Sequence, residues 1–159
     1  NKRDTMTVYI RNSFFPFSKV DSAKAVIDSL TFKGEFEFMN LSAGNYYIAV
    51  THRNSIETWS KLTQSFTPGN LTSYDMTNSA SKAYGDNLLL KSGKYCIYSG
   101  DVNQDGTIDL SDLSYIDNDA SNFVSGYVNT DINGDDIVDL SDAAMTDNNA
   151  LNFISKVTP

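Results

Sequence analysis

A twelve-residue acidic pattern occurs twice in this chain, and it constrains the fold more than any other feature. Residues 101–112 read DVNQDGTIDLSD and residues 131–142 read DINGDDIVDLSD. The likeness continues beyond the pattern, because 13 of 25 positions are identical between 101–125 and 131–155. A solvated acidic tail would not keep apolar residues at fixed places, yet Ile108 and Val138 both stand at position 8. The region is therefore a duplicated, folded unit.

Oxygen-bearing side chains recur at positions 1, 3, 5, 9 and 12 of both copies, and position 7 offers a backbone carbonyl. A hard divalent cation takes six to eight oxygen ligands, and this is the ligand spacing of an EF-hand-type calcium loop. The predicted ligands are Asp101, Asn103, Asp105, Thr107, Asp109 and Asp112 in the first loop, and Asp131, Asn133, Asp135, Ile137, Asp139 and Asp142 in the second.

The chemistry of these ligands predicts two bound calcium ions. Carboxylate and amide oxygens suit calcium or magnesium, and magnesium demands a near-ideal octahedron that a crowded carboxylate cage does not offer. His52 and Cys96 are the only histidine and cysteine, so they do not make a zinc site. Position 6 is Gly106 in the first loop but Asp136 in the second. Aspartate tolerates the left-handed backbone of that position, so we expect a working, slightly strained second loop.

A short helix is predicted after each loop, and none before it. Leu113, Ile116, Ala120 and Phe123 form an apolar stripe, with Asp112 expected to cap the helix as well as bind the ion. The second copy offers the corresponding Ala143, Ala150 and Phe153. The segments 93–100 and 125–130, which precede the loops, contain strand formers and glycine. Each repeat is therefore a loop followed by a helix.

Paired loop–helix repeats with aspartate at position 12 resemble the type I-like dockerin module of secreted bacterial plant-wall-degrading systems, over roughly residues 99–157. The resemblance implies one calcium ion per repeat and a cohesin-like protein domain as partner. In that family the partner-binding residues lie at loop positions 10 and 11 and on the following helix. These positions hold Leu110, Ser111, Leu140 and Ser141, of which only the serines fit the usual pattern. Their symmetry would suit a two-fold-related binding face, and it would equally follow from duplication alone.

Charge separates this region from the rest of the chain. Residues 101–159 contain 12 acidic side chains and one basic one, a net charge of −11, whereas residues 1–100 carry 8 acidic and 11 basic ones, a net charge of +3. A small unit with that charge repels itself, so we expect it to fold only with calcium. The acidic balance argues against a nucleic-acid partner, and the sequence contains no membrane-spanning run.

The first hundred residues predict a β-sandwich. Glu35 and Glu37 alternate with Phe36 and Phe38, as in a half-buried strand. Run 34–50 resembles transthyretin-like or carboxypeptidase-regulatory-like domains. The predicted fold is an all-β sandwich of immunoglobulin or transthyretin-like kind over residues 1–99, and a small α-helical dockerin-like domain over 100–159. The predicted strands are Thr5–Arg11, Ala23–Leu30, Gly34–Leu41, Asn45–Arg53, Ile56–Ser60 and Thr72–Thr77.

The sandwich shows no catalytic motif, so we do not expect an enzyme. His52 and Glu57 are too close in sequence, on a strand and turn, to converge as part of a catalytic triad. Trp59 and the tyrosines could stack on sugars, but sandwich core is the favoured interpretation. Cys96 lies in a strand-like run and is expected to be a buried free thiol.

Two functions follow. The first is a secreted or cell-surface docking module, in which the sandwich braces a dockerin-like tail as an X-module does, by an intramolecular contact that the short link Ser99–Gly100 favours. The second is a calcium-stabilised structural or spacer domain of a secreted enzyme, with no cohesin partner. Carbohydrate binding by the sandwich is a third interpretation.

Overall fold

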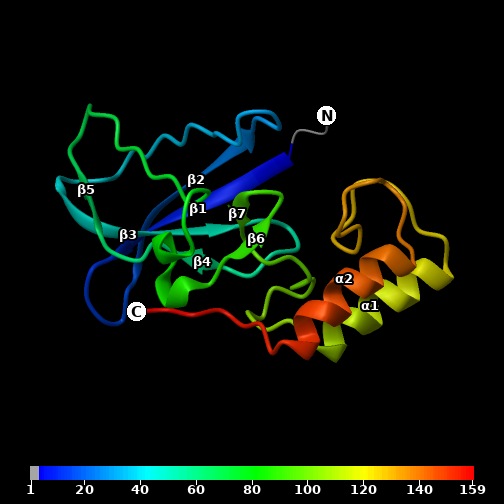
Figure 1. Cartoon of the computed structure of the whole chain (residues 1–159). Helices are drawn as coiled ribbons and strands as arrows, with labels where there is room; N and C mark the ends of the chain where they lie inside the picture. The colour runs from blue at the N-terminus through cyan, green and yellow to red at the C-terminus, as the bar shows by residue number, and fades with distance from the viewer. Residues whose placement is uncertain (1–3) are drawn as a thin grey trace. The chain divides into compact units, whose positions relative to one another are not determined.

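The computed structural model describes residues 4–159, which form two compact units (Figure 1). The sheet unit consists of residues 4–52, Glu57–Cys96 and Val157–Pro159, and the loop unit consists of Arg53–Ile56 and Ile97–Lys156. The units differ from the predicted division at residue 99 in three places, since residues 53–56 and 97–99 fold with the loop unit and residues 157–159 with the sheet unit. No helix within residues 4–159 is long and apolar enough to cross a membrane.

The sheet unit contains two antiparallel sheets. The larger has the strand order β2-β1-β3-β4, with β5 also paired to β3, and the smaller is the β6–β7 hairpin. The strands are β1 (Asp4–Asn12), β2 (Lys19–Ile27), β3 (Gly44–Thr51), β4 (Thr58–Trp59), β5 (Gln64–Phe66), β6 (Leu89–Lys91) and β7 (Lys94–Cys96), and the 3₁₀ turns are η1 (Ala80–Lys82) and η2 (Tyr84–Asp86). The predicted all-β character is confirmed, while its immunoglobulin or transthyretin-like connectivity stays a prediction.

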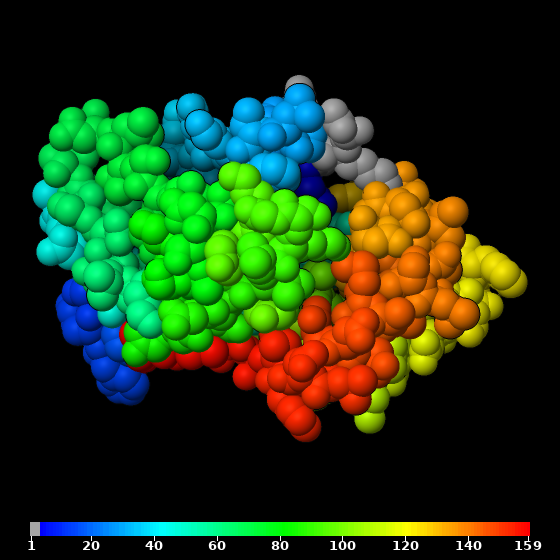
Figure 2. Space-filling model, viewed as in Figure 1, coloured from blue at the N-terminus to red at the C-terminus, as the bar shows by residue number. Residues whose placement is uncertain are grey.

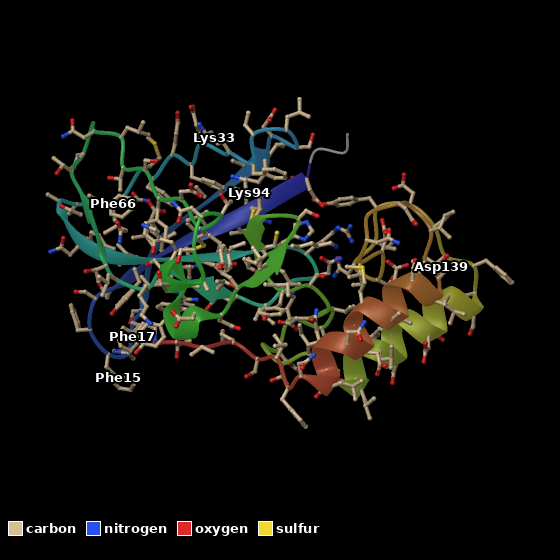
Figure 3. The ribbon with its side chains drawn as sticks, in the orientation of Figure 1. Phe15, Phe17, Lys33, Phe66, Lys94 and Asp139 are labelled. Atoms are coloured by element: carbon tan, nitrogen blue, oxygen red, sulfur yellow. The ribbon has the colours of Figure 1, made fainter. Side chains whose placement is uncertain are left out.

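The core of the larger sheet lies along β1 and β3. Val8 pairs with Val50 and Ile10 with Ile48, so that branched side chains face each other across the strands. Trp59 is 4% exposed, which confirms its prediction as core. Phe15, at the β1–β2 connection, differs because it is 83% exposed, and its ring makes a T-shaped contact with Phe17 at 6.2 Å between centroids (Figure 3).

Two predicted strands are wrong. Gly34–Leu41 and Thr72–Thr77 contain no strand, although Phe36 and Phe38 do alternate in burial with exposed glutamates. The chain is extended there, and the ring of Phe38 meets Phe66 edge to face, at 6.4 Å between centroids. A period of two requires only an extended chain with one buried side, and it does not supply a neighbouring backbone to pair with.

The predicted burial of Cys96 is also wrong. Cys96 is a free, exposed cysteine at the end of β7, in a hairpin whose side chains are mostly exposed. Strand propensity located the hairpin, but a two-stranded sheet buries little on either face.

The loop unit contains two helices of equal length, α1 (Leu110–Ser121) and α2 (Leu140–Leu151), which lie side by side (Figure 1). Asp109 and Asp139 are the N-caps, and each forms a capping box with the aspartate three residues later. The prediction that Asp112 caps its helix is therefore wrong by one turn, because Asp112 is the third helical residue.

The core of this unit is built from both repeats and includes Val102, Ile116, Ile132, Val138 and Ala143. Phe123 and Phe153, which the apolar stripe placed in this core, are 91% and 88% exposed. Each follows the end of its helix in a left-handed conformation, with φ of 55° and 53°. The helical period therefore stops before these phenylalanines.

We predict that Thr146→Val stabilises the loop unit. Thr146 is fully buried at the position where the first repeat has Ile116, and its hydroxyl oxygen has no hydrogen-bond partner. Removing an unsatisfied buried hydroxyl should raise the free energy of unfolding by about 1 kcal/mol. Thermal loss of helical circular dichroism, followed in millimolar calcium, measures the change.

The matched control is Thr130→Val. Thr130 is also buried, but its hydroxyl donates a 2.6 Å hydrogen bond to Asp119. This variant should lower the melting temperature, because it leaves a carboxylate oxygen without its donor. Equal losses in both variants would show that the Thr146 hydroxyl is satisfied.

Candidate functional site

The first aspartate of each loop is buried, and one of its oxygens accepts the backbone N–H of position 6. Asp101 is 2% exposed and Asp131 is 1% exposed. The Oδ2 atom of Asp101 accepts the N–H of Gly106 at 3.1 Å, and that of Asp131 accepts the N–H of Asp136 at 3.2 Å. These bonds join positions 1 and 6 and curl each loop into a tight turn.

Position 6 has the left-handed backbone that the sequence predicts. The φ angle is 92° at Gly106 and 70° at Asp136. Position 4 is left-handed as well, with φ of 61° at Gln104 and 77° at Gly134. Each loop therefore has one glycine and one residue with a side chain at its two left-handed positions, in opposite order.

The last aspartate of each loop is fully buried and accepts three backbone N–H groups. The Oδ1 atom of Asp112 accepts from Val102 at 2.8 Å and Asn103 at 3.1 Å, and Oδ2 accepts from Asp109 at 3.0 Å. Asp142 repeats all three bonds with its own loop, at 2.7, 2.9 and 3.0 Å. Position 12 thus ties the start of the loop to the start of the helix.

The middle positions of the loops are exposed and bonded to one another. Asn103 accepts the N–H of Asp105 at 2.8 Å and donates its amide to the carboxylate of Asp105 at 3.0 Å. Asn133 and Asp135 make the equivalent pair. Asp139 lies just before α2, where hydrogen bonds from the side chain and backbone of Ser141 lower its pKa (Figure 3).

Burial makes the first loop electrostatically unfavourable without a cation. Burial raises the pKa of Asp101 to about 6, the charge of Asp112 acts in the same direction, and the hydrogen bond from Gly106 opposes both. The Oδ1 atom of Asp101 is buried and has no hydrogen-bond partner. A buried carboxylate oxygen needs a donor or a cation, so the residues present fit a bound metal ion.

The acidic side chains are not already gathered around one point. Across residues 4–159, no three aspartate, glutamate, histidine or cysteine side chains converge as metal ligands. Only positions 1 and 12 are held inside each loop, whereas the side chains at positions 3, 5 and 9 lie at the surface. The metal ligands named from the sequence, including the carbonyls of Thr107 and Ile137, stay a prediction.

The predicted partner-binding residues divide into two kinds. Leu110 and Leu140 are 71% and 80% exposed. The hydroxyls of Ser111 and Ser141 instead donate to Asp109 and Asp139 within their own loops, at 2.7 and 2.5 Å. The leucines are therefore available to a partner, while the serines have a structural role.

An apolar groove of about 390 Å³ lies beside Leu140, between the end of α1 and the second loop. Its rim includes two residues that sequence reasoning missed as surface features, Phe123 and Ile137, the latter 56% exposed. The second repeat, coloured orange to red, occupies much of the loop unit's visible face (Figure 2). The sequence pattern predicted a buried phenylalanine after each helix, because its spacing continues the apolar stripe of that helix.

The histidine and acid that are close in sequence have different partners. His52 lies 2.7 Å from the carboxylate of Asp4, whereas Glu57 pairs with Arg11 at 3.0 Å and accepts from Trp59 at 2.7 Å.

Comparison with known proteins identifies the fold and no family. No family model matches the chain, and no curated protein matches it. A chain from the crystal structure of an N-terminal interface mutant of a type II cohesin–X–dockerin complex from Acetivibrio cellulolyticus aligns with 91% of this chain and 79% of its own length, at 23% identity and a TM-score of 0.50. A chain from a C-terminal interface mutant of that complex aligns over the same shares, at 22% identity and a TM-score of 0.46. The first likeness shows a shared fold that extends over most of this chain.

Proposed function

We propose that this chain is a calcium-binding, non-catalytic attachment module of a secreted bacterial protein, which binds a cohesin-like domain through its loop unit. The observation that carries the proposal is the repeated burial of two carboxylates per loop, with one oxygen of Asp101 lacking any hydrogen-bond partner. The sheet unit would serve as the bracing module. The shared fold with a chain from a cohesin–X–dockerin complex supports this assignment.

Two calcium ions would be held by the predicted ligands of the two loops. Calcium would supply the positive charge that buried Asp101 and Asp112 lack, and would bring the net charge of residues 101–159 from −11 to about −7. The position 1 and position 12 carboxylates are already fixed by backbone N–H groups. The exposed side chains at positions 3, 5 and 9 would complete the ligand set, together with the carbonyls of Thr107 and Ile137.

The partner surface would be built around Leu110, Leu140 and the groove beside Phe123. Interfaces of this kind use exposed apolar side chains at their centre and polar groups at the rim. The asparagines and aspartates of α1 and α2 that face solvent would form that rim. A secreted or cell-surface location follows from this function and from the calcium that extracellular fluid supplies.

The alternative is a calcium-stabilised spacer without a cohesin partner, which the same loops would serve. The exposure of Leu110, Leu140 and Phe123 favours docking, since a spacer has no need of apolar residues at repeated surface positions. Carbohydrate binding through Trp59 is less well supported, because that side chain is 4% exposed and offers no open ring face.

Calcium binding is tested by titration calorimetry and circular dichroism. We expect two ions per chain and loss of the helical signal in excess chelator, because the unfavourable charge of residues 101–159 is no longer offset. Asp101→Ala and Asp131→Ala should each remove one ion. Asp117→Ala, in the exposed middle of α1, should leave both sites unchanged. A helical spectrum that is identical with and without chelator would contradict calcium-dependent folding.

Docking is tested by calorimetry with purified type II cohesin domains in calcium. The double variant Leu110→Asp/Leu140→Asp should weaken binding at least 100-fold, because it replaces the two exposed leucines of the proposed surface with charges. Leu71→Asp, at a 90% exposed leucine of the sheet unit, is the matched control and should bind as the wild type does. Calcium binding without capture by any cohesin would favour the spacer.

A further inference from the structure

Residues 53–56 are a short chain segment that completes the loop unit. Gly100 donates to the carbonyl of Asn54 at 2.7 Å, Ile56 donates to that of Tyr98 at 3.1 Å, and Ser55 forms an antiparallel bridge with Ser99. The side chains of Asn54 and Ile56 are 2% and 0% exposed. The segment is therefore fixed along the stretch of chain that leads into the first loop.

The side chains of this segment also bind the second loop. The Arg53 guanidinium lies 4.5 Å from the ring centre of Tyr127 and donates to the carbonyl of Val128. One of its nitrogens lies 3.8 Å from Oδ2 of Asp131, the first predicted ligand of that loop. Asn54 donates to the backbone carbonyl of the same aspartate at 3.0 Å. Asp131 is buried and Arg53 is partly buried, with 1% and 11% of their side chains exposed.

This arrangement distinguishes the two loops. The Oδ2 atom of Asp131 forms an ion pair with Arg53. Its Oδ1 atom accepts the backbone N–H groups of Gly134 at 2.8 Å and Asp135 at 3.1 Å. No basic side chain within residues 4–159 forms an ion pair with Asp101, whose Oδ1 has no hydrogen-bond partner. The contact of the segment with the first loop is uncharged, through Gln104 and the carbonyl of Ser55 at 3.1 Å.

We propose that Arg53 is a positioning residue for the second calcium loop, so that calcium affinity at that loop depends on residues 53–56 while the first loop is independent of Arg53. The inference rests on the proposed calcium function. Arg53 approaches Oδ2, which also accepts the N–H of Asp136, and leaves Oδ1 on the side of the loop amides. It thereby fixes the rotation of the carboxylate from outside the loop.

Two opposite effects of Arg53 on calcium must be compared. The charge of Arg53 repels a calcium ion, while its ion pair with Asp131 orients a predicted calcium ligand in advance. Groups that hold a metal ligand from outside typically change metal affinity 10- to 100-fold when removed. Asp131 is already fixed by three N–H groups, so we place the effect at the lower end, as a loss of about tenfold in second-loop affinity.

Coupling of this kind acts in both directions. If Arg53 strengthens calcium binding at the second loop, calcium at that loop must strengthen the attachment of residues 53–56. The N–H of Ile56, which donates to Tyr98, reports this attachment. Its hydrogen exchange should slow as the second loop fills with calcium.

The experiment titrates the full chain with calcium and follows binding by calorimetry and by NMR. The N–H resonance of Gly106 reports on the first loop and that of Gly134 on the second. Arg53→Met keeps the aliphatic stem and removes the charge. The calcium concentration at the midpoint of the Gly134 titration should rise about tenfold, while that of the Gly106 titration stays unchanged. Arg53→Lys should recover part of the loss, because it restores a charge near Asp131. Arg11→Met, which removes the ion pair with Glu57 in the sheet unit, is the matched control and should shift neither midpoint.

The outcomes separate the inference from the proposed function. Wild-type binding of two ions with an unchanged or tighter second loop in Arg53→Met overturns the inference alone, as does a lysine variant no better than the methionine one. A wild type that takes up no calcium overturns the proposed function and this inference together. Should Arg53→Met fail to fold, Tyr127→Leu replaces it, since Tyr127 is 60% exposed and supports the guanidinium. Its second-loop midpoint should shift in the same direction, and an unchanged midpoint again overturns the inference.

Discussion

The loop unit depends on a reciprocal pairing, in which each loop is closed by the chain that follows the helix of the other repeat. Ile108 of the first loop donates to Ile154, and Val138 of the second donates to Val124. A second pair of bonds, from residue 156 to 106 and from 126 to 136, repeats the symmetry. Neither repeat can therefore complete its own loop. Duplication here is a structural requirement, and the shared core of both repeats follows from it.

This pairing concentrates negative charge, because it buries both ends of each acidic loop. Asp112 and Asp142 are stabilised by three N–H groups each, so their burial has a local compensation. Asp101 accepts fewer N–H groups, and burial raises its pKa to about 6. Asp131 has an arginine nearby instead. Two loops with almost the same sequence thus have different electrostatic surroundings, and the source of the difference lies outside the repeats.

Sequence reasoning succeeded where the structure is local. The left-handed backbone at Asp136 and the burial of Ile108 followed from the loop pattern, and so did the existence of both helices. The predictions were wrong where hydrophobic periodicity was the sole evidence for how a segment packs. The stripe ending at Phe123 continued past the helix, and the alternation around Phe36 suited an extended chain as well as a paired strand. Hydrophobic period describes which side of a segment is buried, but not what covers it.

The sequence by itself determined the two acidic loops, their turns and the helices that follow, because ligand spacing, left-handed positions and capping residues act within twelve residues of chain. Only the tertiary structure decided that residues 53–56 belong with those loops and that Arg53 meets Asp131. Asn54 and Asp131 are 77 positions apart, and nothing in the local pattern of either segment specifies the other. Such a contact forms only when the folded chain brings the partly buried Arg53 next to the buried Asp131, so that opposite charges partly offset the cost of removing Asp131 from water.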